Sequence, residues 1–389
     1  MHLRGGWLAL ALALAPALCG AQSDPARAAQ NPASPGDGQQ LSPGVRFEPV
    51  APPPPPPKSG MALILPAKAQ GFERAAEITQ KGFMAARELD GEKPAVQVIE
   101  TDGTAAGAIA AYREALAKNV AVIVGPLTKT EVAAVAKEPI AVPTLMLNTP
   151  DGAFSPARGL YVLSLSTEFE ARVAADRAFQ RDGGGAVIVT STSPLSKRAA
   201  AAFAESWTRQ GGVVKDTIEF SGNPIKVKKT IDQLRPEMVF LAVDAERARV
   251  IRPFLGRNMP VFATSQVYAA TPRPDAPHTP DLNGLRFIDI PWLHQPDNAA
   301  AMVYPHPQPA VSADLERLYA LGIDAFRVAL QLSRERSDFE IDGVTGKLVV
   351  GGGQIERTPI LAEYRDGVAV LREGSGPSGE RAALPAATR

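Results

Sequence analysis

Short apolar segments alternate with longer segments of helical periodicity over most of residues 61–263. Met61–Pro66 is an apolar run of strand length, and Ala121–Val124 is another of the same kind. Between such runs, Glu73–Leu89 repeats apolar side chains about one helical turn apart. Because parallel neighbouring strands need a long crossover that is usually a helix, this alternation restricts the fold to parallel sheets covered by helices on both faces.

The alternation runs through two successive series, the first ending near residue 147 and the second beginning near residue 168. We expect strands at Met61–Pro66, Ala95–Glu100, Ala121–Val124, Val142–Leu147, Ala186–Thr190, Val213–Phe220, Met238–Val243, Val261–Ala263, Gly343–Val350 and Ile360–Arg365. We expect helices at Glu73–Leu89, Ala105–Lys118, Lys129–Lys137, Glu168–Asp182, Ser196–Gln210, Ile225–Leu234, Ala245–Leu255 and Ser312–Ser333. The pattern therefore predicts an α/β chain with two lobes, each a mainly parallel sheet flanked by helices.

The two lobes are expected to share residues 60–371, with approximate boundaries. Lobe I takes residues 60–160 plus 282–335, and lobe II takes residues 165–265 plus 340–371. Each lobe is thus assembled from separate stretches, so the chain crosses between the lobes more than once.

Residues 1–21 have the features of a secretory signal peptide: a basic start, an apolar run and small residues at the end. Two processing routes remain open. Cleavage after Ala21 would place small residues at both recognition positions, whereas lipidation would use Cys19, the only cysteine of the chain. Leu18 stands where a lipoprotein signal usually has a small residue. Either route takes the protein out of the cytoplasm.

Residues 22–59 predict a disordered, proline-rich tether that ends in six consecutive prolines, Pro52–Pro57. Part of the high proline content, 36 against about 20 at average usage, is concentrated here. The tether is either a spacer that holds the folded part away from an anchor or an inert linker. Residues 372–389 are expected to be a disordered tail.

Composition and motifs exclude several classes of protein. With 41 basic and 41 acidic residues, the chain lacks the positive charge of a general nucleic-acid binder. One cysteine and four histidines, without an HExxH pattern, argue against a disulfide framework and a metal site. No serine-hydrolase elbow, dinucleotide fingerprint or phosphate loop is present. We therefore expect no catalytic residue, metal or cofactor, although paired carboxylates that are distant in sequence stay open.

Small and polar residues follow several of the expected strands. Because ligands of open parallel sheets bind beyond the carboxyl ends of the strands, these residues could line a ligand or partner cleft between the lobes. They are Pro66, Gly125, Pro126, Thr128, Asn148, Ser191, Thr264 and Ser265. The same residue types are also common in ordinary turns after strands, and the two interpretations remain equally open.

Several longer segments together resemble one family. These segments are VGPLTKTEV (124–132), PTLMLN (143–148), PVFATSQVY (260–268), DLNGLRFIDIPWLHQPD (281–297), RLYALGIDAFRVALQL (317–332) and GVTGKLVV (343–350). In this order they resemble the carboxy-terminal domain of the LpoA-type penicillin-binding-protein activators. The resemblance covers roughly residues 60–370.

The resemblance implies a two-lobed fold of the type 1 periplasmic-binding-protein class. It also implies a non-catalytic periplasmic regulator of peptidoglycan synthesis, whose partner is a class A penicillin-binding protein. Such activators are lipoproteins on the inner face of the outer membrane, which favours lipidation of Cys19. A tether stands where some members carry a helical-repeat domain, so the anchoring and the choice of synthase are not settled by the resemblance.

A second function class fits the same fold, namely the solute-binding protein of an amino-acid-type ABC transporter. For a protein partner, we expect contacts in the proline-rich loops 269–280 and 295–309. The segment with Phe287, Ile288, Ile290 and Trp292 is instead expected to be a buried crossing between the lobes.

Overall fold

The computed structural model describes residues 57–151, 154–268 and 280–372. The chain divides into two units, residues 1–55 and 56–389, and all the described residues belong to the second. The predicted signal peptide, Cys19, nearly all of the predicted tether and all but the first residue of the predicted tail lie outside the described residues. Two residues at the start of the described part bond to lobe I. The Pro57 carbonyl accepts a hydrogen bond from Asn119 Nδ2, and Lys58 Nζ donates to the Ala141 carbonyl.

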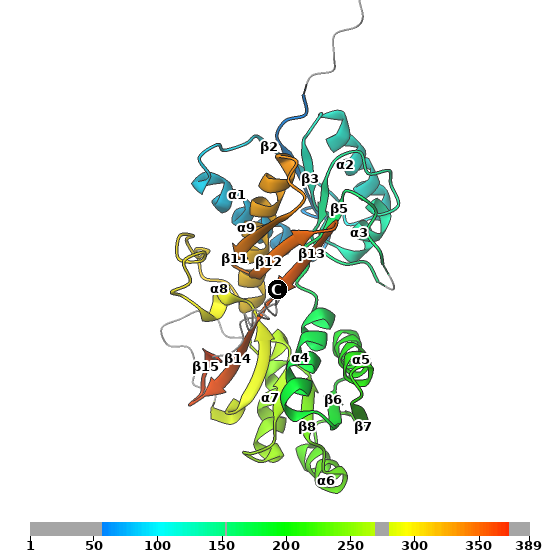
Figure 1. The fold of residues 1–389 in the computed structure, drawn as a ribbon, viewed down its shortest axis with the longest axis vertical. Coiled ribbons are helices and arrows are strands. Elements are labelled where there is room, and N and C mark those ends of the chain that lie inside the picture. The colour runs from blue at the N-terminus through cyan, green and yellow to red at the C-terminus, as the bar shows by residue number, and fades with distance from the viewer. Residues whose placement is uncertain (1–56, 152–153, 269–279, 373–389) are drawn as a thin grey trace, which may run out of the picture. The chain divides into compact units, whose positions relative to one another are not determined.

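The first sheet has five parallel strands in the order β2-β1-β3-β4-β5. Its strands are β1 (Met61–Leu65), β2 (Val96–Glu100), β3 (Val122–Val124), β4 (Thr144–Met146) and β5 (Leu160–Val162). The helices of this lobe are α1 (Glu73–Leu89), α2 (Ala105–Ala117), α3 (Lys129–Val135), the short α8 (Pro291–His294) and α9 (Ala313–Ser333). Figure 1 shows this lobe in the upper half of the ribbon.

The sequence of β1 is apolar without a break because helices cover both faces of this strand. Leu63 and Leu65 pack in one core cluster with α1 and α9, while Ala62 and Ile64 pack in another with α2 and α3. Successive side chains of a strand point to opposite faces, so a strand covered on both faces buries every residue. All five residues of β1 are fully buried.

Helices α1 and α9 approach each other at two glycines. A Cβ atom on Gly82 would lie 1.9 Å from the Tyr319 carbonyl oxygen, and one on Gly322 would lie 2.1 Å from the Thr79 carbonyl oxygen. Both distances are far below van der Waals contact, so only glycine permits this crossing. The Phe83 and Phe326 rings then pack edge to face with their centroids 5.3 Å apart.

The second sheet has seven strands in the order β15-β14-β10-β9-β8-β6-β7. Its strands are β6 (Gly185–Thr190), β7 (Val213–Glu219), β8 (Met238–Ala242), β9 (Val261–Ala263), β10 (Leu285–Asp289), β14 (Ile360–Arg365) and β15 (Val368–Leu371). The helices of this lobe are α4 (Thr167–Asp182), α5 (Pro194–Arg209), α6 (Pro224–Leu234) and α7 (Ala245–Ile251). Strands β14 and β15 run antiparallel to their neighbours, whereas the others pair in parallel.

A third, antiparallel sheet contains β11 (Phe339–Gly343), β12 (Gly346–Gly351) and β13 (Gln354–Thr358). Its inward side chains, among them Ile341, Leu348 and Val350, belong to the core cluster that also holds α1 and α9. This small sheet is therefore part of lobe I.

The two-lobed, mainly parallel α/β fold is confirmed, but the expected lobe boundaries are wrong in two places. Residues 282–289 were expected in lobe I, yet β10 pairs with β9 and β14 in the sheet of lobe II. Residues 340–358 were expected in lobe II, yet β11–β13 pack on lobe I. In both places an apolar pattern identifies a buried segment without saying which core buries it.

The described chain crosses between the lobes in three short segments, at residues 163–166, at Ile290 and at Pro359. The buried crossing expected near Trp292 is present there, because Phe287 and Ile288 belong to a lobe II strand whereas Ile290 and Trp292 belong to the lobe I core.

Candidate functional site

The predicted cleft residues of lobe I lie at the strand ends but bond within their own lobe. Thr128 caps α3 through a capping box with Glu131, and Asn148 donates from Nδ2 to the Leu127 carbonyl at 3.0 Å. Gly125 has a φ of 96°, and a Cβ there would lie 2.1 Å from the Ile64 carbonyl oxygen. Pro66 and Pro126 are buried next to these residues. These positions therefore shape the turns after the strands.

The predicted cleft residues of lobe II make side-chain and amide hydrogen bonds within their own lobe. The Ser191 and Ser196 hydroxyl groups are 2.8 Å apart, and the Ser265 amide donates to Glu170 Oε2 at 2.9 Å. Thr264 is buried and lines a small hollow of about 80 Å³ within lobe II. Of the eight predicted residues, Thr264 lines this hollow and none of the others does. As ligand contacts they remain a prediction.

A buried ion pair joins the lobes close to these residues. Asp289 ends β10 of lobe II, and Arg317 lies near the start of α9 in lobe I. Arg317 donates from Nε and Nη2 to the two carboxylate oxygens of Asp289, at 2.9 and 2.8 Å. The same Nη2 also donates to the carbonyls of Ser265 and Tyr268, and His294 Nε2 lies 2.9 Å from Asp289 Oδ2.

Charge and burial oppose each other in this ion pair. Burial alone would raise the pKa of Asp289, but the charge and hydrogen bonds of Arg317 outweigh it and hold that pKa below its usual value. Glu170 is equally buried without such a direct partner. Burial, helped by the negative charge of Asp289, raises the pKa of Glu170 to about 7.

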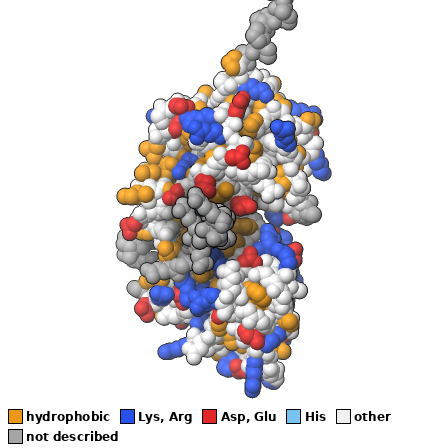
Figure 2. All heavy atoms as spheres, in the orientation of Figure 1, with side chains coloured by type: hydrophobic (Ala, Val, Ile, Leu, Met, Phe, Trp, Pro, Cys, Tyr) orange, Lys and Arg blue, Asp and Glu red, His pale blue; other side chains and the backbone are white. Residues whose placement is uncertain are grey.

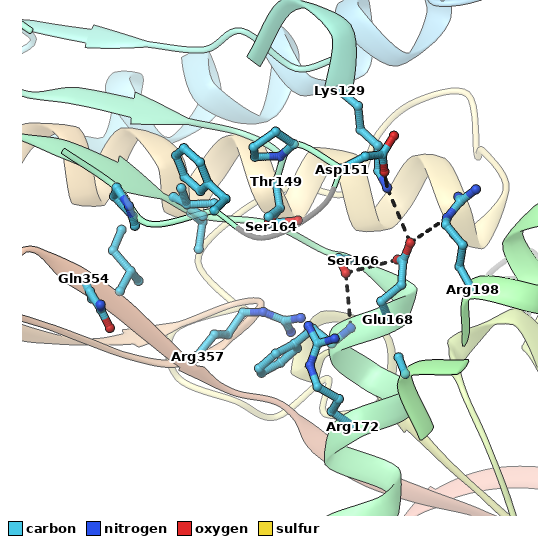
Figure 3. Close-up of a pocket in the computed structure, with 18 of the residues that line it drawn as sticks. Lys129, Thr149, Asp151, Ser164, Ser166, Glu168, Arg172, Arg198, Gln354 and Arg357 are labelled. Carbon is cyan, nitrogen blue, oxygen red and sulfur yellow. Dashed lines mark hydrogen bonds and ion pairs between the residues drawn. The ribbon is translucent and has the colours of Figure 1, made fainter. Parts of the chain in front are cut away.

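A pocket of about 590 Å³ lies between the lobes, beside the first turns of α4. Its walls come from the loop after β4, the end of β5, the first turns of α4, helix α5 and strand β13. Apolar lining is supplied by Phe154, Pro156, Val162, Leu163, Phe169 and Ile355. A volume of this size suits a small organic molecule. Figure 3 shows ten of the lining residues labelled around it.

Ion pairs close one side of this pocket. Glu168 on α4 accepts from Arg198 Nε at 2.7 Å and from Lys129 Nζ at 3.4 Å, and Lys129 also contacts Asp151 at 2.7 Å. Because Lys129 belongs to lobe I and Glu168 to lobe II, these charges bridge the lobes at the surface. Burial opposes ionisation of Glu168, but the hydrogen bond from Arg198 and the nearby positive charges lower its pKa.

The opposite side of the pocket holds two arginines. Arg357 comes from β13, is 8% exposed, and places its guanidinium over the Phe169 ring at 5.0 Å from the centroid. Arg172 comes from α4, and it has no hydrogen-bond or ion-pair partner among the described residues. Figure 3 shows their side chains converging from the strand and from the helix.

Sequence reasoning missed this pocket. Lys129 and Thr149 directly follow predicted cleft residues, but the prediction includes none of the lining side chains from α4, α5 and β13. The only signal was the polar start of α4, where Ser166 caps the helix. Within the described ranges, no group of three or more potential ligands could hold a metal ion, and no helix has the length and hydrophobicity to span a bilayer.

Comparison with known proteins connects this fold to named relatives. A family model described as LppC putative lipoprotein matches residues 56–367. A penicillin-binding protein activator LpoA from Haemophilus ducreyi is 29% identical over 326 residues, covering 79% of this chain and 54% of the relative. The chain spans about half the length of the curated relatives it matches.

Two solved structures share the two-lobed fold. A putative branched-chain amino acid ABC transporter from Chromobacterium violaceum has a TM-score of 0.67 and 32% identity, covering 79% of this chain and all (100%) of that chain. The C-domain of LpoA from Haemophilus influenzae, described as a regulator of PBP1A, has a TM-score of 0.65 and 22% identity, covering 81% of this chain and 100% of that domain.

Proposed function

Because the chain belongs to the LppC family of putative lipoproteins, we propose that it is a non-catalytic regulator of cell-wall synthesis. It binds a class A penicillin-binding protein in the periplasm and activates it. The observation that carries this proposal is the family match, which extends over both lobes and ends just before β15. Relatives named as activators of penicillin-binding proteins match 64% and 79% of this chain.

Activation by such a protein needs no chemistry of its own. A regulator that binds one conformation of the synthase more tightly than another raises the population of that conformation by the difference in affinity. The internal bonding of the strand-end residues supports a protein partner, because these groups are not presented to a solute in the described conformation.

The loop 295–309 offers a surface for the synthase. Met302 and Val303 are 68% and 57% exposed, although both are large and apolar. Their loop is fixed to α9, since the Tyr319 hydroxyl donates to the Pro305 carbonyl at 2.8 Å and His306 Nδ1 lies 3.3 Å from a Glu316 oxygen. An apolar pair held outward on an anchored loop is typical of a protein contact. The other expected loop, 269–280, lies outside the described residues except for Pro280.

The remaining proposals concern location. The protein is anchored to the inner face of the outer membrane through a lipid on Cys19, and residues 22–59 hold the two-lobed body, residues 60–371, away from that membrane. At about 3.1 Å per residue, a fully extended segment of this length would reach roughly 120 Å. Replacing Cys19 with Ser should move the protein from the membrane to the soluble fraction. An unchanged membrane fraction would reject the lipid as the anchor.

The activation is tested directly with purified proteins. The chain from residue 22 onward is added to a class A penicillin-binding protein of the same envelope, and glycan polymerisation and crosslinking are followed. We expect binding and a faster rate of at least one reaction. The absence of both binding and a rate change would reject the regulator proposal.

The loop contact is tested by the double substitution Met302→Asp with Val303→Asp. Burying two charges in the interface should weaken binding of the synthase by about tenfold or more, with an unchanged thermal midpoint. Ile225→Asp on α6 is the matched control, because Ile225 is a comparably exposed apolar residue on the other lobe. Equal binding by the double variant and the control would remove this loop from the interface.

The Chromobacterium violaceum relative supports a second candidate, a solute-binding protein of an amino-acid transporter. Leucine, isoleucine or valine should then raise the thermal midpoint of the free protein by several degrees at millimolar concentration. No shift together with activation of the synthase would reject this candidate.

A further inference from the structure

Arg357 has hydrogen-bond donors that the described fold leaves unused. Its Nη1 donates to the Thr345 carbonyl at 3.1 Å, but Nε and Nη2 are buried without a partner. A buried charged group without partners is unfavourable, so natural proteins rarely keep one without a reason. The face of Phe169 offsets only part of this cost.

The acidic residues of the pocket do not neutralise Arg357 or Arg172. Asp151 and Glu168 are occupied by Lys129 and Arg198, and Glu205 pairs with Arg209 at 3.3 Å. The buried carboxyl groups of Glu170, Asp324 and Asp289 favour the charge of Arg357 from a distance, but burial outweighs them and lowers its pKa. Two guanidinium groups therefore converge on one side of the pocket without an ion-pair partner among the described residues (Figure 3). Like charges brought together in a partly desolvated site favour the entry of an anion.

The other lining residues indicate that the anion has an apolar part as well as a charged group. Phe154 and Leu163 of lobe I face Phe169 of lobe II across the same pocket, and the apolar lining is larger than an inorganic ion could use. Arginine binds carboxylate and phosphate oxygens through paired N–H groups, and an aromatic wall favours an apolar body next to them.

We propose that this pocket binds a small organic anion, whose carboxylate or phosphate group lies between Arg172 and Arg357 and whose apolar body packs against Phe154 and Phe169. The ligand contacts α4 of lobe II and β13 of lobe I together, so its binding fixes the two lobes relative to each other. The strand-end residues predicted as a cleft take no part in this site.

The test is direct binding to the chain from residue 22 onward, measured by calorimetry and by the thermal midpoint. The probes are 3-phenylpropanoate, phenyl phosphate and the neutral 3-phenylpropanamide, with acetate and inorganic phosphate as anions that lack an apolar body. We expect at least one of the two aromatic anions to bind, and the stronger one identifies the head group. The amide and the simple ions should bind at least tenfold more weakly.

Two substitutions locate the site. Arg357→Met and Arg172→Met should each weaken binding of the preferred probe by tenfold or more, whereas Arg249→Met, at an exposed arginine outside the pocket lining, should not change it. Arg172 is only half-buried, so its variant folds even where Arg357→Met does not. Failure of both aromatic anions to bind, equal binding of the amide, or full binding by Arg172→Met would overturn the proposal. None of these measurements involves the synthase, so the proposed function stands or fails separately.

Discussion

Two ion pairs between the lobes, Arg317–Asp289 and Lys129–Glu168, differ in how much water surrounds them. Arg317 and Asp289 are buried and form two direct hydrogen bonds, supplemented by two backbone carbonyls. Lys129 and Glu168 lie at the rim of the pocket, 3.4 Å apart, and Lys129 is shared with Asp151. The buried link is costly to break, whereas the rim link is screened by solvent and salt.

The two ion pairs also differ in what lies next to them. The buried pair holds α9 against lobe II beside the crossing at Ile290, where the chain itself limits movement. The rim pair lies beside the pocket, where a small change of lobe orientation would alter the space for a ligand. The strong contact therefore lies beside a chain crossing and the weak one beside the pocket.

The largest expected effect comes from removing the buried cation. Arg317→Met leaves the Asp289 carboxylate buried without its main partner, and unpairing a buried ion pair destabilises a protein by about 3–5 kcal/mol. We expect a loss of this order in the free energy of unfolding, measured by urea denaturation at pH 7. Arg334→Met, which removes a surface pair with Glu92, is the control and should cost less than about 1 kcal/mol. Similar losses for both variants would contradict the contrast between the links.

An intermediate effect is expected from Glu170 and depends on pH. The pKa of Glu170 is raised in the folded state from 4.5 to about 7, so the folded protein binds the proton more tightly than the unfolded chain. The resulting stabilisation is full below pH 4.5 and is lost as pH rises through about 7, by an amount on the order of 3 kcal/mol. Glu170→Gln removes this dependence.

The measurement compares urea denaturation of wild type and Glu170→Gln at pH 5 and pH 8. The stability of the variant relative to wild type should increase between these two values. Asp176→Asn on the same helix serves as the control, because Asp176 accepts hydrogen bonds from Ser206 and Gln210 near the surface. A pH-independent difference for Glu170→Gln would show that this carboxyl group ionises normally in the fold.

The smallest effect is expected at the rim. Glu168→Gln removes the charge that joins Lys129 to Arg198, and ion pairs that solvent can reach contribute about 0.2–1 kcal/mol. The loss should shrink further when the salt concentration is raised from 0.05 to about 0.5 M, because the Debye length falls. A loss that exceeds that of Arg317→Met, or that does not respond to salt, would reverse the comparison.

The sequence was sufficient for the parts of the fold that depend on local pattern. Apolar runs such as Met61–Pro66 and helical spacing such as that of Glu73–Leu89 correspond to β1 and α1 within a residue. The lobe that receives β10 or β11–β13 depends on which distant strands they pair with, and one sequence carries no record of that pairing.

The pocket could not be predicted from the sequence, for a related reason. Arg357 and Arg172 are 185 positions apart and meet only because β13 packs beside the start of α4. In the sequence, Arg357 stands in a polar stretch and resembles any solvated arginine. Its burial and its unused donors are properties of the tertiary structure alone.

The glycine contact between α1 and α9 fixes the position of these two helices along each other. Gly82 and Gly322 bring backbone against backbone, so sliding either helix along the other would drive a bulkier side chain into a carbonyl group. Arg317 lies on the same helix as Gly322, about one and a half turns before it, and bonds to Asp289 of lobe II. A load on lobe II would therefore pass into this pair of helices through Arg317, as well as through the three short crossings of the described chain.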